Sequence, residues 1–115
     1  MSETVSLYVV HCLDAPGMQD KRIELTEAHR RYVAEQGERI FFGGPLFDET
    51  DGRRVGSLIV LKAAGREQAR AFMEAEPYCA NGVFESVQIR AFQCVTRPDA
   101  AVRLQQQSQP EGEQP

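Results

Sequence analysis

The sequence contains no tryptophan, few cysteines and no long hydrophobic run. Its longest apolar stretches are four residues, such as residues 58–61, whereas a membrane-spanning helix needs about 20. We therefore expect no transmembrane helix. Residues 1–4 also lack the basic and apolar regions of a secretory signal, which favours a cytoplasmic protein.

The cysteine content argues against a disulfide scaffold and against a zinc site. Cys12, Cys79 and Cys94 are odd in number, and none lies in a CxxC or similarly close spacing. We interpret them as reduced thiols that are mostly packed. No cluster of metal ligands is recognisable, so no metal ion is expected.

Cationic residues are fewer than anionic ones. The 13 Lys and Arg against 17 Asp and Glu give a formal charge of −4, which would repel a polyphosphate backbone. Nucleic acid is therefore not an expected partner. The sequence also has no GxGxxG, P-loop, HExxH or GxSxG motif, so nucleotide-binding, zinc-protease and α/β-hydrolase functions lack their main support.

The 115 residues, 42% of them hydrophobic and 26% charged, suffice for one soluble domain with a single core. Residues 5–12 are apolar on both alternating sides, which predicts a strand covered on both faces. Leu25, Ala28 and Tyr32 then follow helical spacing. They predict a helix over about residues 20–36, ended by Gly37.

The second half of the chain repeats this alternation. Residues 40–42 and 55–61 predict two strands, and the Asp51-Gly52 dipeptide between them favours a hairpin turn. Residues 66–76 predict a second helix, closed by a proline. Residues 84–95 predict the last strand.

The resulting order, β-α-β-β-α-β, is that of an α+β, ferredoxin-like fold, an antiparallel sheet with both helices on one face. We expect one domain over residues 1–97 and a disordered tail over residues 98–115, which are rich in glutamine and proline. Because the first and third strands are apolar on both sides, the open sheet face needs a cover. A second copy packed sheet to sheet, a homodimer of the dimeric α/β-barrel type, is the simplest cover.

His29 is the most informative titratable residue. It lies one turn after Leu25 and one turn before Tyr32, at the edge of the expected buried stripe. Two interpretations stay open, a hydrogen-bonded structural histidine or an acid–base group. Arg22 lies two turns earlier on the same face, and is either solvated or available to a ligand.

Glu76 falls seven residues after Ala69, on the buried face of the second helix in its last turn. The helix dipole disfavours a carboxylate there by about 0.3–1 kcal/mol, so Glu76 should seek a cation. If the two helices lie side by side, His29 or Arg22 supplies one, and a carboxylate that orients an imidazole suits acid–base chemistry. The alternative is that Glu76 reaches solvent past the helix end.

Three residues from other segments are further candidates for the site or its surroundings. Pro45 follows two glycines at the end of the second strand, which suits a bend or a close backbone approach. Ser57 either points into a cleft or only fills a strand position. Cys79 lies in an expected loop with no flanking cation to lower its pKa, so a nucleophilic role is not expected.

Several short motifs occur in a characteristic order: Gly43-Gly44-Pro45-Leu46, Gly56-Ser57, Glu76-Pro77-Tyr78 and Gly82-Val83-Phe84. In this order and spacing they resemble the YCII-related family, over roughly residues 5–96. The resemblance implies a ferredoxin-like homodimer with a cleft that holds a histidine and an acid suspected of catalysis. By position these are His29 and Glu76, the latter where the family usually has Asp before Pro-Tyr.

With this resemblance, four more residues are expected to bind the substrate: Arg22, Ser57, Pro45 and Tyr78. The family often has a second arginine between the first arginine and the histidine, and here that position is Thr26. This departure argues against a highly anionic substrate.

The resemblance leaves the reaction open. Some similar proteins act as lactone dehalogenases in the breakdown of chlorinated aromatics. This implies that His29 and Glu76 move a proton beside a lactone or other carbonyl, in isomerisation or halide elimination, without a metal or organic cofactor. Cofactor-free monooxygenases of similar architecture are a second enzyme alternative.

Two alternatives involve no catalysis. The same cleft could hold a small metabolite in a binding module that performs no chemistry. RNA-recognition domains share the order of elements, but their third strand carries aromatic residues that stack on bases, and residues 55–61 contain none.

Overall fold

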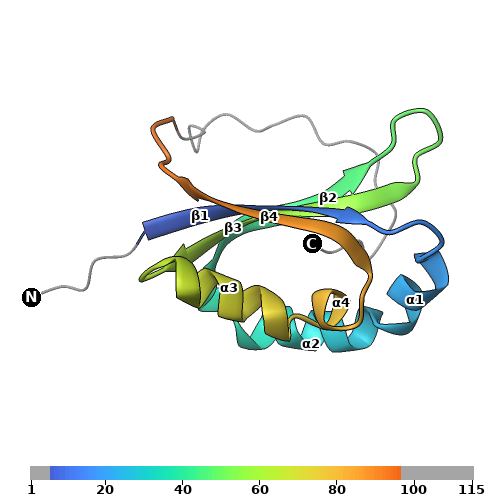
Figure 1. Ribbon diagram of the computed structural model, residues 1–115, viewed down its shortest axis with the longest axis horizontal. Coiled ribbons are helices and arrows are strands. Elements are labelled where there is room, and N and C mark those ends of the chain that lie inside the picture. Colours follow the sequence, from blue (N-terminus) through green and yellow to red (C-terminus); the bar gives the residue numbers. More distant parts are fainter. Residues whose placement is uncertain (1–5, 97–115) are drawn as a thin grey trace, which may run out of the picture.

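The computed structural model describes residues 6–96, which form a four-stranded antiparallel sheet with its helices on one face (Figure 1). The elements are β1 (Ser6–Asp14), α1 (Gln19–Glu24), α2 (Thr26–Glu35), the short 3₁₀ helix η1 (Gly37–Arg39), β2 (Ile40–Phe47), β3 (Arg54–Ala63), α3 (Arg66–Ala75), α4 (Pro77–Ala80) and β4 (Phe84–Phe92). The strand order is β2-β3-β1-β4. The expected ferredoxin-like fold is therefore confirmed, while the expected tail lies outside the described residues.

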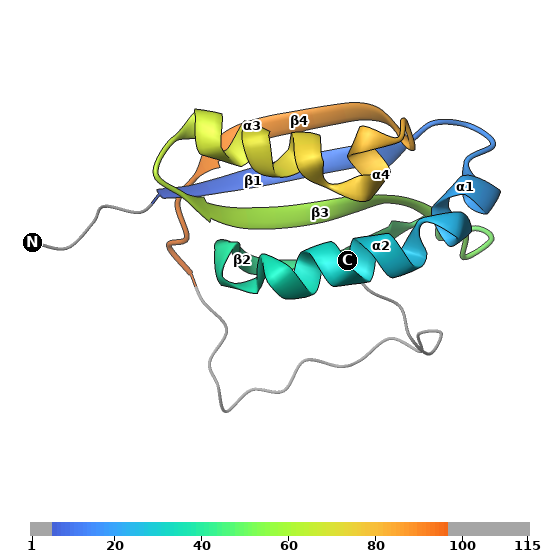
Figure 2. The same ribbon diagram turned by 90° about the horizontal axis from the view of Figure 1, so that it is seen from below.

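The core lies between the sheet and α3. Alternate residues of the central strands β1 and β3 point toward the helices, and α3 adds the three apolar residues that its sequence spacing predicts. The buried set is Val10, Cys12, Ile59, Leu61, Ala63, Ala69, Phe72 and Met73. Seen from the helix side, α2 and α3 lie in front of the sheet, on either side of β3 (Figure 2). This arrangement brings the ends of the two helical segments close together.

The first helical segment is not one helix over residues 20–36, as its periodicity predicts. It is divided at Leu25 into α1 and α2. The hydroxyl of Thr26 donates to the carbonyl oxygen of Arg22 at 3.0 Å, a local bond that competes with regular helix geometry. The buried residues of the two helices are Arg22 and His29. The side of these helices that faces the interior therefore carries two polar residues.

Two further element boundaries differ from the sequence prediction. β2 does not end before Pro45 but continues through it to Phe47. A proline is tolerated there because β2 is an edge strand, so one of its sides has no neighbouring strand. The segment after α3 is not a loop, since Pro77–Ala80 forms the short helix α4.

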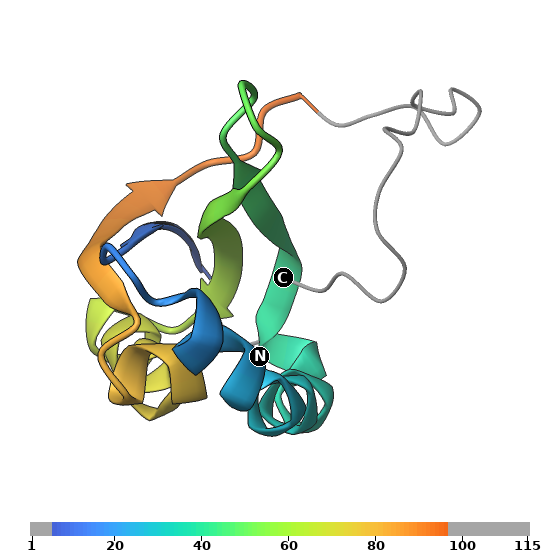
Figure 3. The same cartoon turned by 90° about the vertical axis from the view of Figure 1, so that its right-hand side faces the viewer.

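The opposite face of the sheet carries no described helix (Figure 1). Viewed along the layers, the sheet is an arc rather than a plane (Figure 3). By the strand register, this open face presents Leu7, Val9, His11 and Leu13 from β1, and Leu58, Val60 and Lys62 from β3. Within residues 6–96, no helix is long and apolar enough to cross a membrane.

Candidate active site

A buried histidine and a buried glutamate form the centre of the site. Nδ1 of His29, on α2, lies 2.6 Å from Oε2 of Glu76, 47 residues later in the chain. The two residues are only 2% and 1% exposed. The structure thus brings together the predicted pair, and it rules out the alternative in which Glu76 reaches solvent.

Glu76 lies at the C-terminal end of α3, as predicted, but it is at the same time the first residue of a second helical turn. α3 ends at Ala75, and Glu76 is the N-cap of α4, where its Oε1 accepts a hydrogen bond from the backbone N–H of Cys79 at 3.1 Å. A carboxylate is stabilised at a helix N-terminus rather than disfavoured. One oxygen of Glu76 therefore binds backbone while the other meets His29, which fixes the orientation of the carboxylate.

The ring of Tyr78 connects this pair to a second one. The imidazole of His29 stacks on the ring at a centroid distance of 4.3 Å and an interplanar angle of 20°. The guanidinium carbon of Arg22 lies 4.4 Å from the centroid of the same ring. Tyr78 is itself 2% exposed. Its observed contacts are therefore those of a residue that positions His29 and Arg22.

The second pair is formed by Arg22 and Asp14. Nε and Nη2 of Arg22 donate to the two carboxylate oxygens of Asp14 at 3.0 and 2.8 Å, a bidentate ion pair between α1 and the end of β1. Both side chains are nearly buried, at 8% and 13% exposed. Burial by itself lowers the pKa of Arg22, but the hydrogen bond and charge of Asp14 raise it above its ordinary value, with a smaller contribution from Tyr78. The guanidinium stays charged and is neutralised locally.

Ser57 and Pro45 face each other across β3 and β2 on the helix side of the sheet. Ser57 is 1% exposed, and its Oγ has no hydrogen-bond partner among the described residues. Pro45 is half-buried. Of the six predicted site residues, direct contacts join Arg22, Tyr78, His29 and Glu76. Ser57 and Pro45 lie on the same face of the sheet as the pairs.

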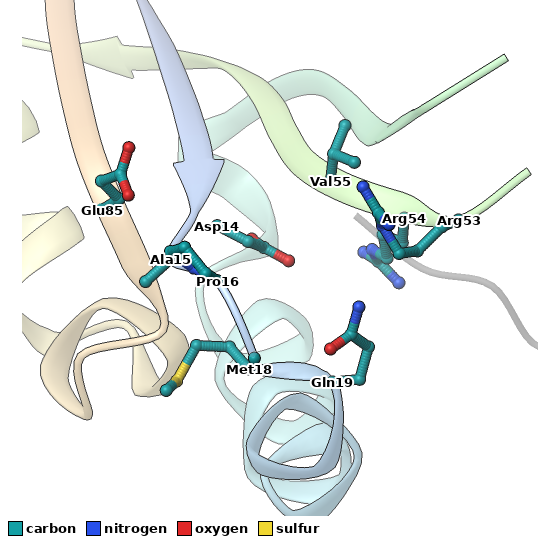
Figure 4. Close-up of a pocket in the computed structure, with 10 residues that line it drawn as sticks. Asp14, Ala15, Pro16, Met18, Gln19, Arg53, Arg54, Val55 and Glu85 are labelled. Carbon is teal, nitrogen blue, oxygen red and sulfur yellow. The ribbon is translucent and has the colours of Figure 1, made fainter. Parts of the chain in front are cut away.

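A cavity of about 340 Å³ opens beside the ion pair. It is bounded by Asp14, the loop that follows β1, the start of β3 and Glu85 of β4. Figure 4 shows Asp14 with Ala15 and Pro16 on one side of the cavity and Arg53 and Arg54 on the other. The sequence predicts a cleft at His29, but His29 does not line this cavity. Of the residues in the two buried pairs, Asp14 is the one that lines it.

The three cysteines are free thiols, as the sequence predicts. Burial raises the pKa of Cys12 to about 12, and nearby Cys79 and Glu76 add to the effect. Burial also raises the pKa of Cys79, so neither thiol is activated as a nucleophile. Among the described residues, no group of three or more His, Cys, Asp or Glu side chains is arranged to hold a metal ion.

Sequence reasoning did not single out Asp14 as a site residue. Its signal is a carboxylate directly at the end of an apolar strand, eight residues before Arg22. The distance along the chain is short, but the pairing depends on how α1 folds back toward the end of β1.

The fold and these two buried acid–base pairs define a small ferredoxin-like protein with a polar site between its sheet and its helices. The chain belongs to the YCII-related domain family, whose sequence profile matches residues 6–93. It is 30% identical over 96 residues to Protein YciI of Escherichia coli O6:H1, covering 77% of this chain and 98% of the relative. Protein YciI of Shigella flexneri matches with the same values. The family predicted from the short motifs is confirmed.

A solved structure shares the fold. It is 5-chloro-2-hydroxyhydroquinone dehydrochlorinase (TftG) from Burkholderia phenoliruptrix AC1100, in complex with 2,5-dihydroxybenzoquinone. The TM-score is 0.68 and the sequence identity 24%, over 76% of this chain and 93% of that chain. At this identity the likeness establishes the common fold.

Proposed function

We propose that this protein is an enzyme that acts on a lactone or another small carbonyl compound. In this proposal His29 transfers a proton, and Glu76 orients the imidazole of His29. The observation that carries this proposal is the buried contact of 2.6 Å between Nδ1 of His29 and Oε2 of Glu76. Burying two ionisable groups costs free energy unless they are paired. Buried ionisable groups with a specific charged partner are typical of sites of acid–base catalysis.

We assign a role to each atom of the pair. In this proposal Nδ1–H of His29 donates a hydrogen bond to the carboxylate of Glu76, and Nε2 is the nitrogen that takes the substrate proton. Nε2 then takes a proton from a carbon next to the substrate carbonyl. In an elimination, the electron pair of that C–H bond forms a C=C bond and a halide leaves with its bonding electrons. In an isomerisation, His29 returns the proton to another carbon.

Access to His29 is the main demand on this mechanism, because the imidazole is only 2% exposed. The cavity at Asp14 offers a route. Asp14 holds Arg22, and Arg22 contacts the same Tyr78 ring as His29. A substrate that enters at Asp14 therefore needs the Arg22 and Tyr78 side chains to shift before it meets the imidazole.

The shared fold supports the choice of reaction. The similar Burkholderia protein is a dehydrochlorinase in complex with a dihydroxybenzoquinone, so this fold accommodates halide elimination from a ring compound. We extend that reaction type, but not that particular substrate, to the present chain. A lactone or chlorinated hydroxy-ring compound is the proposed substrate class.

Deuterium incorporation from D₂O tests the proton transfer without knowledge of the product. Proton NMR should show the purified protein exchanging hydrogens next to the carbonyl, or releasing halide, in a panel of small lactones and chlorinated hydroquinones. His29→Gln should reduce the rate by roughly 10² to 10⁴, the usual contribution of a positioned acid or base. Glu76→Gln should reduce it less, because Glu76 orients the imidazole. Arg31→Gln, at an exposed position of the same helix α2, is the control and should retain the rate.

The second candidate function is a binding module for a small metabolite. It is favoured by the burial of His29, which is only 2% exposed. It makes a different prediction in the same assay. The panel would include compounds that bind and depend on His29 for affinity, yet none would exchange or lose halide. That result would replace the enzyme proposal.

We also propose that the protein forms a homodimer through the open face of the sheet. This face carries Leu7, Val9 and Leu58, which are partly exposed, and Leu13, Phe42 and Phe92 remain 39%, 49% and 39% exposed. Monomeric proteins rarely leave so continuous an apolar patch in water. A second copy presents the same patch and covers it by two-fold symmetry.

A further inference from the structure

Two buried hydrogen-bond donors near the site have no acceptor among the described residues. They are Nη1 of Arg22 and Oγ of Ser57, in residues only 6% and 1% exposed. Leaving a buried polar group unpaired costs about 1–3 kcal/mol, and native structures keep few such groups. A ligand that supplies an acceptor would remove this cost.

The strand register places both donors at the same end of the sheet. Ser57 lies opposite Cys12 on the helix side, and Asp14 follows Cys12 on that side two residues later. Asp14 binds Nε and Nη2 of Arg22, which leaves Nη1 as the nitrogen directed away from the carboxylate. Arg22 and Ser57 thus lie at the same end of the sheet, on its helix side.

The cavity lies at this end of the sheet. Neither Arg22 nor Ser57 lines it, so a ligand in the cavity must displace part of its wall to reach the two donors. Asp14, the partner of Arg22, forms part of its wall, and so does Val55. Ser57 lies two residues beyond Val55 on the same face of β3. A volume of about 340 Å³ suits a single substituted ring.

The charges around the donors decide what kind of acceptor fits. Asp14 neutralises Arg22 within the buried pair, so Nη1 offers a strong donor without a net positive charge. A carboxylate ligand would meet the negative charge of Asp14 at close range. An uncharged carbonyl oxygen meets two donors and no net repulsion.

We propose that Nη1 of Arg22 and Oγ of Ser57 together bind the carbonyl oxygen of an uncharged cyclic compound, and that Asp14 sets this preference by excluding carboxylates. The inference rests on the proposed function and narrows its substrates to neutral lactones and cyclic ketones. When His29 removes a proton, negative charge develops on this oxygen. The two donors then stabilise it as an oxyanion hole does.

Ser57→Ala tests the role of the hydroxyl. In the free protein the substitution removes an unpaired buried group, so thermal unfolding should show equal or higher stability. NMR titration with 2(5H)-furanone, a neutral lactone, should show about threefold to tenfold weaker binding, the contribution of one hydrogen bond. Ser86→Ala, on the opposite face of the sheet, is the control and should change neither value. Lower stability with unchanged affinity would mean that Ser57 only supports the fold, and would overturn the proposal.

Asp14→Asn tests the preference for uncharged ligands. The same titration with 2-furoate, a carboxylate of similar size, should show that wild-type protein binds the anion more weakly than the lactone. In Asp14→Asn the ratio of anion to lactone affinity should rise by about tenfold or more, because the charge of Arg22 is no longer neutralised. Asp20→Asn removes an equal charge from an exposed position of α1 and should leave the ratio unchanged.

The binding and exchange assays separate this inference from the proposed function. An unchanged ratio in folded Asp14→Asn overturns the inference even if His29 transfers protons. If Asp14→Asn does not fold, the Ser57→Ala titration still decides. Conversely, selective binding of the lactone without any exchange supports the two-donor site and contradicts the enzyme proposal.

Discussion

Arg22 and His29 are the most buried side chains of the first helical segment, and both are polar. An amphipathic helix normally buries its apolar stripe, but Leu25, Ala28 and Tyr32 are only half-buried here. The polar residues are tolerated inside because each meets a carboxylate, Asp14 or Glu76.

Cys12 provides a pH-dependent test of burial at the residue scale. Its pKa rises from 9.0 to about 12, chiefly through burial. Above about pH 9 the unfolded chain therefore loses a proton that the folded protein retains, so the unfolded state binds fewer protons. The free energy of unfolding should fall as pH rises from about 9 toward 12, by at most about 1.4 kcal/mol per pH unit from this group.

Urea unfolding over this alkaline range checks the prediction. Wild-type protein and Cys94→Ala should show the same slope of unfolding free energy against pH, because Cys94 is near the end of the described chain and only half-buried. Cys12→Ala should show a shallower slope, whatever its absolute stability. Equal slopes in all three proteins would mean that the Cys12 thiol ionises as easily in the folded state as in the unfolded one.

At the scale of elements, the close approach of β1 and β3 depends on Gly56. A Cβ at this position would overlap the carbonyl oxygen of Cys12 on the neighbouring strand. That oxygen belongs to the backbone and cannot move without separating the strands that position Ser57 and Asp14. Packing between the two strands thus explains why a glycine precedes Ser57.

We expect Gly56→Ala to destabilise the protein by roughly 3 kcal/mol, as overpacking in a closed site does. Gly44→Ala is the matched control, since a Cβ at Gly44 meets no atom within 4 Å, and it should change stability by less than about 0.5 kcal/mol. Chemical denaturation of both variants measures the difference. Similar stabilities for the two would show that β1 and β3 can separate at little cost.

The whole molecule has two unlike faces. Helices cover one side of the sheet, and no described helix covers the other (Figure 1). By the strand register, most residues that β1 and β3 present on that open face are apolar, with His11 and Lys62 among them. This face is the one that the proposed dimer would cover.

Sedimentation equilibrium at low micromolar concentration tests the proposed dimer. Wild-type protein should have twice the mass of one chain. Leu58→Lys should yield monomers, because it places a charge at the centre of the open face without a described acidic partner there. Ile23→Lys, at a residue 71% exposed on α1, is the control and should remain dimeric. A wild-type monomer would contradict the dimer, while leaving the site proposals to their own tests.

The sequence by itself determined the order and nature of the main elements. Periodicities of two and 3.6 residues reflect which side of a strand or helix is buried, so the other strands, the second helix and the β2–β3 hairpin were predicted within a few residues. β2 was predicted only over residues 40–42, but it continues to Phe47. The motif order identified the family, and with it His29 and Glu76 as a candidate pair.

Tertiary structure alone decided the contacts. The division at Leu25, the helix α4 and the cap formed by Glu76 depend on hydrogen bonds that propensity does not encode. The approach of His29 to Glu76, across 47 residues, and the closure of Asp14 onto Arg22 depend on how α1, α2 and α4 pack on the sheet. Spacing along a chain assigns a residue to a face, but only packing in three dimensions brings two such faces within hydrogen-bond distance.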